Sequence, residues 1–177
     1  MTAQAFVDES TRRGEYLMCV AVCHDGQLRA ARKELKGLLL PGQRRLHFAT
    51  EGDRRRREIL SRISEMVVES AMYTAPHRHQ PQARTAILER VAMDLAADGV
   101  TRLTLESREG QDHHDRAVLY RALGPEAAVG YQHSTPSSEP LLWIPDAVAW
   151  AFGRGGDWKR RLDQLGLVAR VEQVKVP

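Results

Sequence analysis

The stretch Phe6-Val7-Asp8-Glu9-Ser10 is the most informative part of the chain, because an apolar strand ends there on two adjacent carboxylates. A carboxylate at the end of a strand is held by a rigid backbone and still faces solvent, which suits a ligand of a divalent cation. The same acids could instead simply open a hairpin turn. Strand alternation sends Asp8 and Glu9 to opposite faces, so Asp8 is the better candidate ligand and Glu9 the better partner for an arginine.

The periodicity of apolar residues predicts strands and helices that follow one another along the whole chain. Strands are expected at about residues 3–8, 15–23, 66–73, 100–107, 128–133 and 167–176. Helices are expected at about residues 26–40, 52–65, 83–97, 112–123, 141–152 and 158–165. The first two strands follow each other closely enough to pair as a hairpin. This order indicates an α/β fold, with a mixed β-sheet flanked by helices.

Length and composition restrict the class of protein. A chain of 177 residues usually forms one compact core, so we expect one domain over residues 1–177. Cys19 and Cys23 lie in an apolar run and are expected to be buried thiols, not a disulfide. The N-terminus has no signal-peptide pattern, and no apolar stretch is long enough to span a membrane. We therefore expect a cytoplasmic protein without a membrane partner.

The basic residues are strongly biased toward arginine, with 22 arginines and only 4 lysines. The planar guanidinium group can donate two parallel hydrogen bonds to a phosphate. A dense cluster around residues 44–57 predicts contact with the backbone of RNA or DNA. Its members that we select as nucleic-acid-binding candidates are Arg45, His47, Arg54, Arg55 and Arg57. The alternative is a solvated helix face in an arginine-rich chain.

Two further acids stand where an element ends or begins. Glu106 ends the expected strand at 100–107, although Leu103 and Leu105 also fit a half-exposed strand with a solvent-facing acid. Asp146 lies in the first turn of an apolar helix, where a carboxylate also complements the helix dipole. Its apolar neighbours favour a functional role, because a partly buried charge needs partners.

Histidines offer a weaker candidate site. Asp112, His113, His114 and Asp115 form a compact polar cluster that could hold zinc or supply a general acid. Their spacing matches no established zinc motif, and a solvated helix start is the commoner explanation.

Three segments together resemble the DUF 3800 family, a bacterial family of unknown function with a ribonuclease H-like fold. Residues 6–10 resemble its N-terminal Asp-Glu-Ser-Gly signature, residues 103–107 its later acidic strand end, and residues 141–150 its closing motif, in which an Asp opens an apolar helix. The resemblance implies a ribonuclease H-like fold and a nuclease that holds Mg²⁺ or Mn²⁺. The implied catalytic and metal-binding residues are Asp8, Glu106 and Asp146.

The chain also departs from the family pattern. Thr11 replaces a Gly, Trp143 and Pro145 replace a Gln and an Ala, and Glu106 stands where Asp is commoner. Arg45 stands where the family has an acid before its Leu-His pair. Two functions are therefore expected. One is a divalent-metal-dependent nuclease that hydrolyses phosphodiester bonds of RNA or DNA by a two-metal mechanism with carboxylate ligands. The other is a catalytically inactive ribonuclease H-like module that binds nucleic acid or protein.

Overall fold

The computed structural model describes residues 2–12, 14–76 and 79–177. The strands are β1 (Ala3–Arg12), β2 (Glu15–His24), β3 (Val68–Pro76), β4 (Val100–Glu106), β5 (Gly130–Ser134) and β6 (Arg170–Gln173). The helices are α1 (Leu28–Gly37), α2 (Asp53–Ser64), α3 (Gln80–Ala97), α4 (Asp112–Leu123), α5 (Trp143–Arg154) and α6 (Gly156–Leu165). Short 3₁₀ segments occupy Asp25–Gln27, Phe48–Thr50 and Pro140–Leu142. Every predicted strand and helix is present, and the differences lie at the ends, where β1 runs longer and the last strand is shorter than expected.

A six-stranded mixed sheet forms the centre of the molecule, in the order β5-β4-β1-β2-β3-β6. The hairpin of β1 and β2 is antiparallel, as is the pair of β2 and β3. Strand β4 runs parallel to β1, and β5 runs parallel to β4. The predicted α/β class with a mixed, helix-flanked sheet is therefore confirmed.

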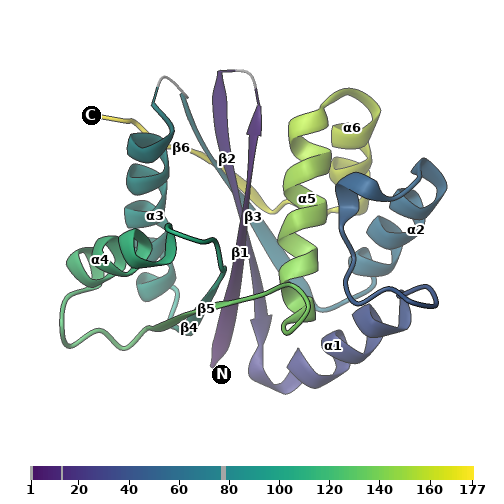
Figure 1. Ribbon diagram of the computed structural model, residues 1–177, viewed down its shortest axis with the longest axis horizontal. Coiled ribbons are helices and arrows are strands. Elements are labelled where there is room, and N and C mark those ends of the chain that lie inside the picture. The colour runs from purple at the N-terminus through teal and green to yellow at the C-terminus, as the bar shows by residue number, and fades with distance from the viewer. Residues whose placement is uncertain (1, 13, 77–78) are drawn as a thin grey trace.

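Helices cover both faces of the sheet, as Figure 1 shows with the sheet seen nearly edge-on. Helices α3 and α4 lie on one face, and α1, α2, α5 and α6 lie on the other. Alternation along β1 supplies both cores, because Phe6 packs on the α5 side and Ala5 and Val7 on the α3 side. Cys19 and Cys23 are free and buried, as predicted.

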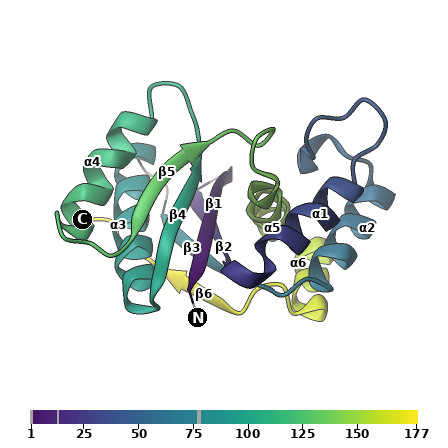
Figure 2. The same cartoon turned by 90° about the horizontal axis from the view of Figure 1, so that it is seen from below.

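Helix α5 lies directly against the sheet, packed on β1 and β2. Seen from below, β4, β1 and α5 are close neighbours in the molecule (Figure 2). Gly153 permits this approach, because a Cβ there would stand 2.7 Å from Arg12 Nε and 2.8 Å from Leu17 Cδ1. None of the helices in the described part of the chain is long and apolar enough to span a membrane.

Replacing Gly153 with alanine should destabilise the protein by about 1–3 kcal/mol, because the added methyl group overpacks the contact between α5 and the sheet. Gly37 offers a matched control at the end of α1, since a Cβ there meets nothing within 4 Å. Gly37→Ala should be neutral or stabilise by up to about 1 kcal/mol, because alanine favours the helix. Chemical denaturation measures both, and equal effects of the two substitutions would contradict this account.

Candidate active site

One pocket, with a cavity volume of about 130 Å³, brings together the three acids selected from the sequence. Asp8 comes from β1, Glu106 from the end of β4 and Asp146 from the first turn of α5. Arg45 and His47 line the same pocket from the segment between α1 and α2, and Arg108 lines it from the loop after β4.

Strand alternation explains how Asp8 and Glu106 share this pocket. Strands β1 and β4 are parallel, with Val7 paired to Leu105, so the next residue on each strand falls at the same level. Val7 and Leu105 both enter the core on the α3 side, and the following residues therefore face α5. Asp146 meets them from α5, where its Oδ2 accepts a hydrogen bond of 3.0 Å from the backbone N–H of Phe48.

The three carboxylates repel one another in a poorly solvated place. Asp8 is only 6% exposed. Burial raises the pKa of Asp8 well above its ordinary value, and the negative charges of Glu106 and Asp146 raise it further. The pKa of Asp146 is also raised, mainly by burial. The hydrogen bond from Phe48 lowers this pKa, and the charge of Glu106 raises it. A positive charge in the pocket would relieve this repulsion.

Guanidinium groups already stand at the rim of the pocket. Arg108 Nη1 lies 2.7 Å from Glu9 Oε1, and Arg108 Nη2 lies 3.5 Å from Asp8 Oδ1. Arg45 Nη2 lies 3.1 Å from His47 Nδ1. The Arg108 side chain remains 45% exposed, so its guanidinium group is open to a ligand as well as to the acids.

Glu9 also lines the edge of the acidic pocket, but its carboxylate pairs with arginine, as the sequence predicts. Its carboxylate meets Arg84 of α3, a residue that is only 5% exposed. Arg84 also donates to both oxygens of Asp115, at 2.9 and 2.7 Å, and to the hydroxyl of Tyr16 at 2.9 Å. Burial by itself raises the pKa of Asp115, but hydrogen bonds from His133 and Arg84 outweigh it and hold the pKa well below its ordinary value.

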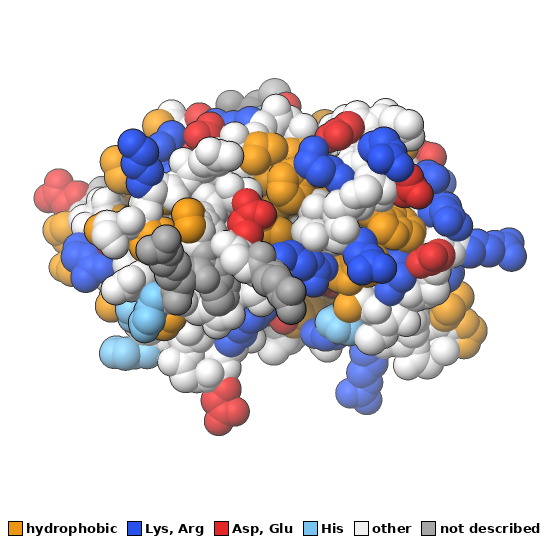
Figure 3. Space-filling view, turned by 90° about the horizontal axis from the view of Figure 1, so that it is seen from above, with side chains coloured by type: hydrophobic (Ala, Val, Ile, Leu, Met, Phe, Trp, Pro, Cys, Tyr) orange, Lys and Arg blue, Asp and Glu red, His pale blue; other side chains and the backbone are white. Residues whose placement is uncertain are grey.

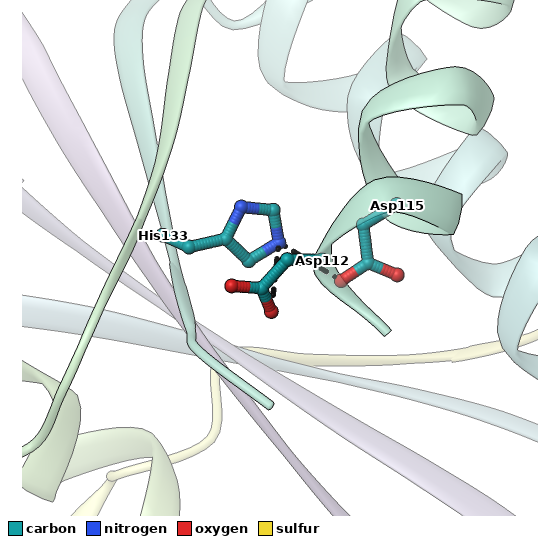
Figure 4. Close-up of side chains that lie close together, drawn as sticks. All are labelled: Asp112, Asp115 and His133. Carbon is teal, nitrogen blue, oxygen red and sulfur yellow. Dashed lines mark hydrogen bonds and ion pairs between the residues drawn. The ribbon is translucent and has the colours of Figure 1, made fainter. Parts of the chain in front are cut away.

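The carboxylates of Asp112 and Asp115 converge on His133, with ligand atoms within 4.8 Å of one another (Figure 4). Each oxygen already has a partner in the protein. Those of Asp115 accept from Arg84, and those of Asp112 accept from the hydroxyl of Ser107 and the backbone N–H of Arg108. We attribute this cluster to folding, because it fixes the loop that carries Arg108.

The histidine of this cluster is His133 of β5, and neither His113 nor His114 belongs to it. Both of those residues are exposed on α4, and His114 lies 3.0 Å from the hydroxyl of Thr85. Arg84 is a partner of these acids that the sequence patterns did not single out. Its position on α3 is in helical phase with the buried residues Ile87, Leu88 and Val91, and a charged residue in that phase is the signal that could have identified it.

The arginines predicted to bind nucleic acid divide into two groups. Arg45 and His47 line the acidic pocket, whereas Arg54, Arg55 and Arg57 lie on α2, outside its lining. Arg55 pairs with Glu58 at 2.9 Å and donates to the carbonyl of Leu38, so it supports the fold. Arg57 lies over the ring of Trp158, with 5.7 Å between its guanidinium carbon and the ring centroid.

Substituting Arg84 with methionine should destabilise the protein by about 3–5 kcal/mol, because Glu9 and Asp115 lose their buried counter-charge. Arg90→Met on the same helix is the control, since Arg90 is 48% exposed and a solvent-exposed ion pair such as the one it forms with Asp94 contributes little to stability. Urea unfolding measures both. A loss for Arg84→Met no larger than that of the control would contradict the proposed buried network.

The raised pKa of Asp8 predicts a pH-dependent penalty. The folded protein binds the proton more tightly than the unfolded chain, so stability falls as the pH rises above the ordinary carboxyl value of about 4. Asp8→Asn removes this penalty and should stabilise the protein by about 0.5–2 kcal/mol near neutral pH, with a smaller gain near pH 4. The exposed Asp163→Asn should change little at either pH. A stabilisation by Asp8→Asn that is the same at both values would disprove the assignment.

Comparison with known proteins concerns the fold alone. No family model and no curated protein matches the chain. Among solved structures, the chain is similar to RNase HII of Archaeoglobus fulgidus in its PCNA complex, at 14% identity and a TM-score of 0.54 over 92% of this chain and 75% of that one. Ribonuclease H2 of Pyrococcus horikoshii OT3 matches at 14% identity and a TM-score of 0.52, over the same shares of the two chains.

A third similar structure is Bst-RNase HIII in complex with Mn²⁺, at 12% identity and a TM-score of 0.56 over 92% of this chain and 54% of that one. Membership in the DUF 3800 family stays a prediction, since no family model matches. The fold that this resemblance implied is confirmed: the chain has a ribonuclease H-like fold.

Proposed function

We propose that this protein is a divalent-metal-dependent nuclease that hydrolyses phosphodiester bonds of RNA or DNA. The observation that supports it most is the meeting of Asp8, Glu106 and Asp146 in one pocket with basic residues at its rim. A phosphodiesterase needs both features, because the acids bind cations and the guanidinium groups bind the substrate phosphate.

The side chains of the pocket fit Mg²⁺ or Mn²⁺. Three carboxylates offer the oxygen ligands that hard cations prefer, and burial, together with the charges of Glu106 and Asp146, raises the pKa of Asp8. One of the similar structures, an RNase HIII, was solved with Mn²⁺. In this proposal Asp8 is the central ligand, supported by Glu106 and Asp146.

Each residue of the pocket then has a definite task. Bound cations supply an activated water and positive charge for the oxyanion that develops at phosphorus. The hydrogen bond from Phe48 holds the carboxylate of Asp146 toward its neighbours. Arg108 and Arg45 would take the non-bridging oxygens of the substrate phosphate, and the buried pair of Glu9 and Arg84 keeps Arg108 in place.

A catalytically inactive module that binds nucleic acid or protein is the second candidate. It is favoured by Arg108, whose guanidinium group contacts Asp8 and Glu9 and could substitute for a cation. Arg45 points the same way, because it places a positively charged residue where the DUF 3800 family, which the sequence resembles, has an acid. Metal binding separates the two candidates.

Nuclease assays with Mn²⁺ or Mg²⁺ and labelled single-stranded RNA, an RNA–DNA hybrid and duplex DNA test the proposal. Asp8→Asn, Glu106→Gln and Asp146→Asn should each lower the rate by about 100-fold or more, because each removes charge stabilisation from the reaction. Asp163→Asn is the matched control, since this aspartate is exposed on α6 and, among the residues that the structure describes, pairs with Lys159. EDTA should abolish cleavage.

Thermal unfolding gives a readout that is independent of cleavage. Saturating Mn²⁺ should raise the melting temperature of the wild type and of Asp163→Asn, because a ligand bound to the folded state stabilises it. Asp8→Asn should lose this shift. No cleavage and no Mn²⁺-dependent shift in the wild type would overturn the nuclease proposal in favour of the inactive module.

A further inference from the structure

A second feature lies outside the acidic pocket, where α2, α5 and α6 meet the end of β1. Two adjoining hollows of about 330 and 430 Å³ share Asp53 and Trp158 in their linings. We call this region the arginine surface, defined by Arg12, Arg56, Arg57, Arg154, Arg160 and Arg161. In the space-filling view, Lys and Arg side chains gather on the half of the molecule formed by these helices (Figure 3).

The arginine surface concentrates the positive charge of the protein. Its six guanidinium groups stand beside only two carboxylates, those of Asp53 and Asp157. This surplus exceeds the formal charge of +3 for the whole chain, so the rest of the molecule is close to neutral. Such a local field attracts an extended anion.

Some of the arginines serve the fold and hold the surface in shape. Arg56 donates to the carbonyls of Phe48 and Ala49 and to Asp53, and it stacks 4.3 Å from the ring centroid of Trp150. Trp150 in turn meets Trp158 edge to face at 5.6 Å. Three others, Arg57, Arg154 and Arg161, form no ion pair with any carboxylate in residues 2–12, 14–76 and 79–177. These three are therefore available to a ligand.

Two of the three elements that carry the acids, β1 and α5, lead from the pocket to the arginine surface. On α5, Asp146 lines the pocket, and Trp150 and Arg154 line the larger hollow at intervals of four residues. On β1, Asp8 and Arg12 stand in the same relation four residues apart. The helix rises about 12 Å over the eight residues from Asp146 to Arg154, and the strand rises about 13 Å over the four residues from Asp8 to Arg12. The arginine surface therefore lies about 12–13 Å from the acids.

This distance matches a repeating phosphate chain. A nucleic-acid strand advances about 3.4 Å per nucleotide along a duplex axis, and its phosphates also wind around that axis, so two places about 12–13 Å apart lie within reach of a few consecutive phosphates of one strand. The hollows contain arginines in place of a deep apolar cavity, which suits contact with a backbone more than recognition of a base. The ligand that fits both places at once is one nucleic-acid strand.

We propose that the arginine surface binds the backbone phosphates of the nucleic acid a few nucleotides from the phosphate that enters the acidic pocket. This inference rests on the proposed function, because that function places the other phosphate in the acidic pocket. Arg57, Arg154 and Arg161 make the phosphate contacts, and the stack of Arg56 on Trp150 supports them.

Binding of a fluorescein-labelled RNA of about 24 nucleotides tests this, measured by fluorescence anisotropy with all variants in the Asp8→Asn background to prevent cleavage. The variant Arg57→Gln/Arg154→Gln/Arg161→Gln should bind about 10–100-fold more weakly at low salt. The slope of log K against log salt concentration should be smaller in magnitude by about 2 for this variant, since each of the three lost phosphate contacts removes about 0.7 from that slope.

The matched control removes the same charge elsewhere. Arg29, Arg102 and Arg116 are exposed on α1, β4 and α4, and they too form no ion pair with a carboxylate in the described part of the chain. Arg29→Gln/Arg102→Gln/Arg116→Gln should change binding less than about twofold. Melting temperatures of both triple variants should match the parent, which excludes unfolding as the cause.

A short oligonucleotide locates the contact. With a dinucleotide, whose single internal phosphate cannot occupy both places, the two triple variants should differ much less in affinity than they do with the long RNA. Equal binding of the long RNA by both triple variants would overturn the arginine surface. The same result, together with Mn²⁺-dependent cleavage by the wild type, would leave the proposed nuclease intact.

The opposite pattern is also informative. Selective loss of long-RNA binding in a protein that neither cleaves nor binds Mn²⁺ would support the arginine surface as a backbone-binding site and overturn the nuclease proposal alone.

Discussion

Two adjacent acids on one strand must face opposite sides of the sheet, and this constraint organises the molecule. Asp8 faces α5 and meets two further carboxylates, whereas Glu9 faces α3 and meets a buried guanidinium group. The same dipeptide therefore creates a place with excess negative charge on one face and a neutralised network on the other. Arg108 contacts both acids and joins the two sides.

The two faces differ in what they contribute to stability. Arg84 gives Glu9 and Asp115 a counter-charge and donates two hydrogen bonds to Asp115, which offsets the cost of removing these charges from water. Asp8 instead has two carboxylates as neighbours, and burial together with their negative charge raises its pKa. A site that is electrostatically unfavourable in the isolated protein is what a cation-binding pocket requires, because binding then relieves the repulsion.

Charge is distributed unevenly over the surface as well. The arginine surface lies beyond the acids along both β1 and α5. A ligand that extends along these elements therefore contacts the acidic pocket at one end and the arginine surface at the other. The close packing of α5 at Gly153 holds the two regions at a constant separation. In the proposed function, this arrangement favours a polyanion long enough to reach both.

The amino-acid sequence by itself determined the order and type of every strand and helix, because apolar periodicity reports which face of each element is buried. It also identified Asp8, Glu106 and Asp146 as a candidate set, and the alternation of β1 predicted the pairing of Glu9 with an arginine. Sequence patterns did not reveal Arg84, Arg108 or His133 as partners of these acids. Their contacts join residues from β1, α3, α4 and β5, and only the tertiary structure decides which charges meet across such separations. The division of the arginines between structural pairs and an open surface likewise depends on the packing of α2 against α5 and α6, since local sequence does not specify a distant counter-charge.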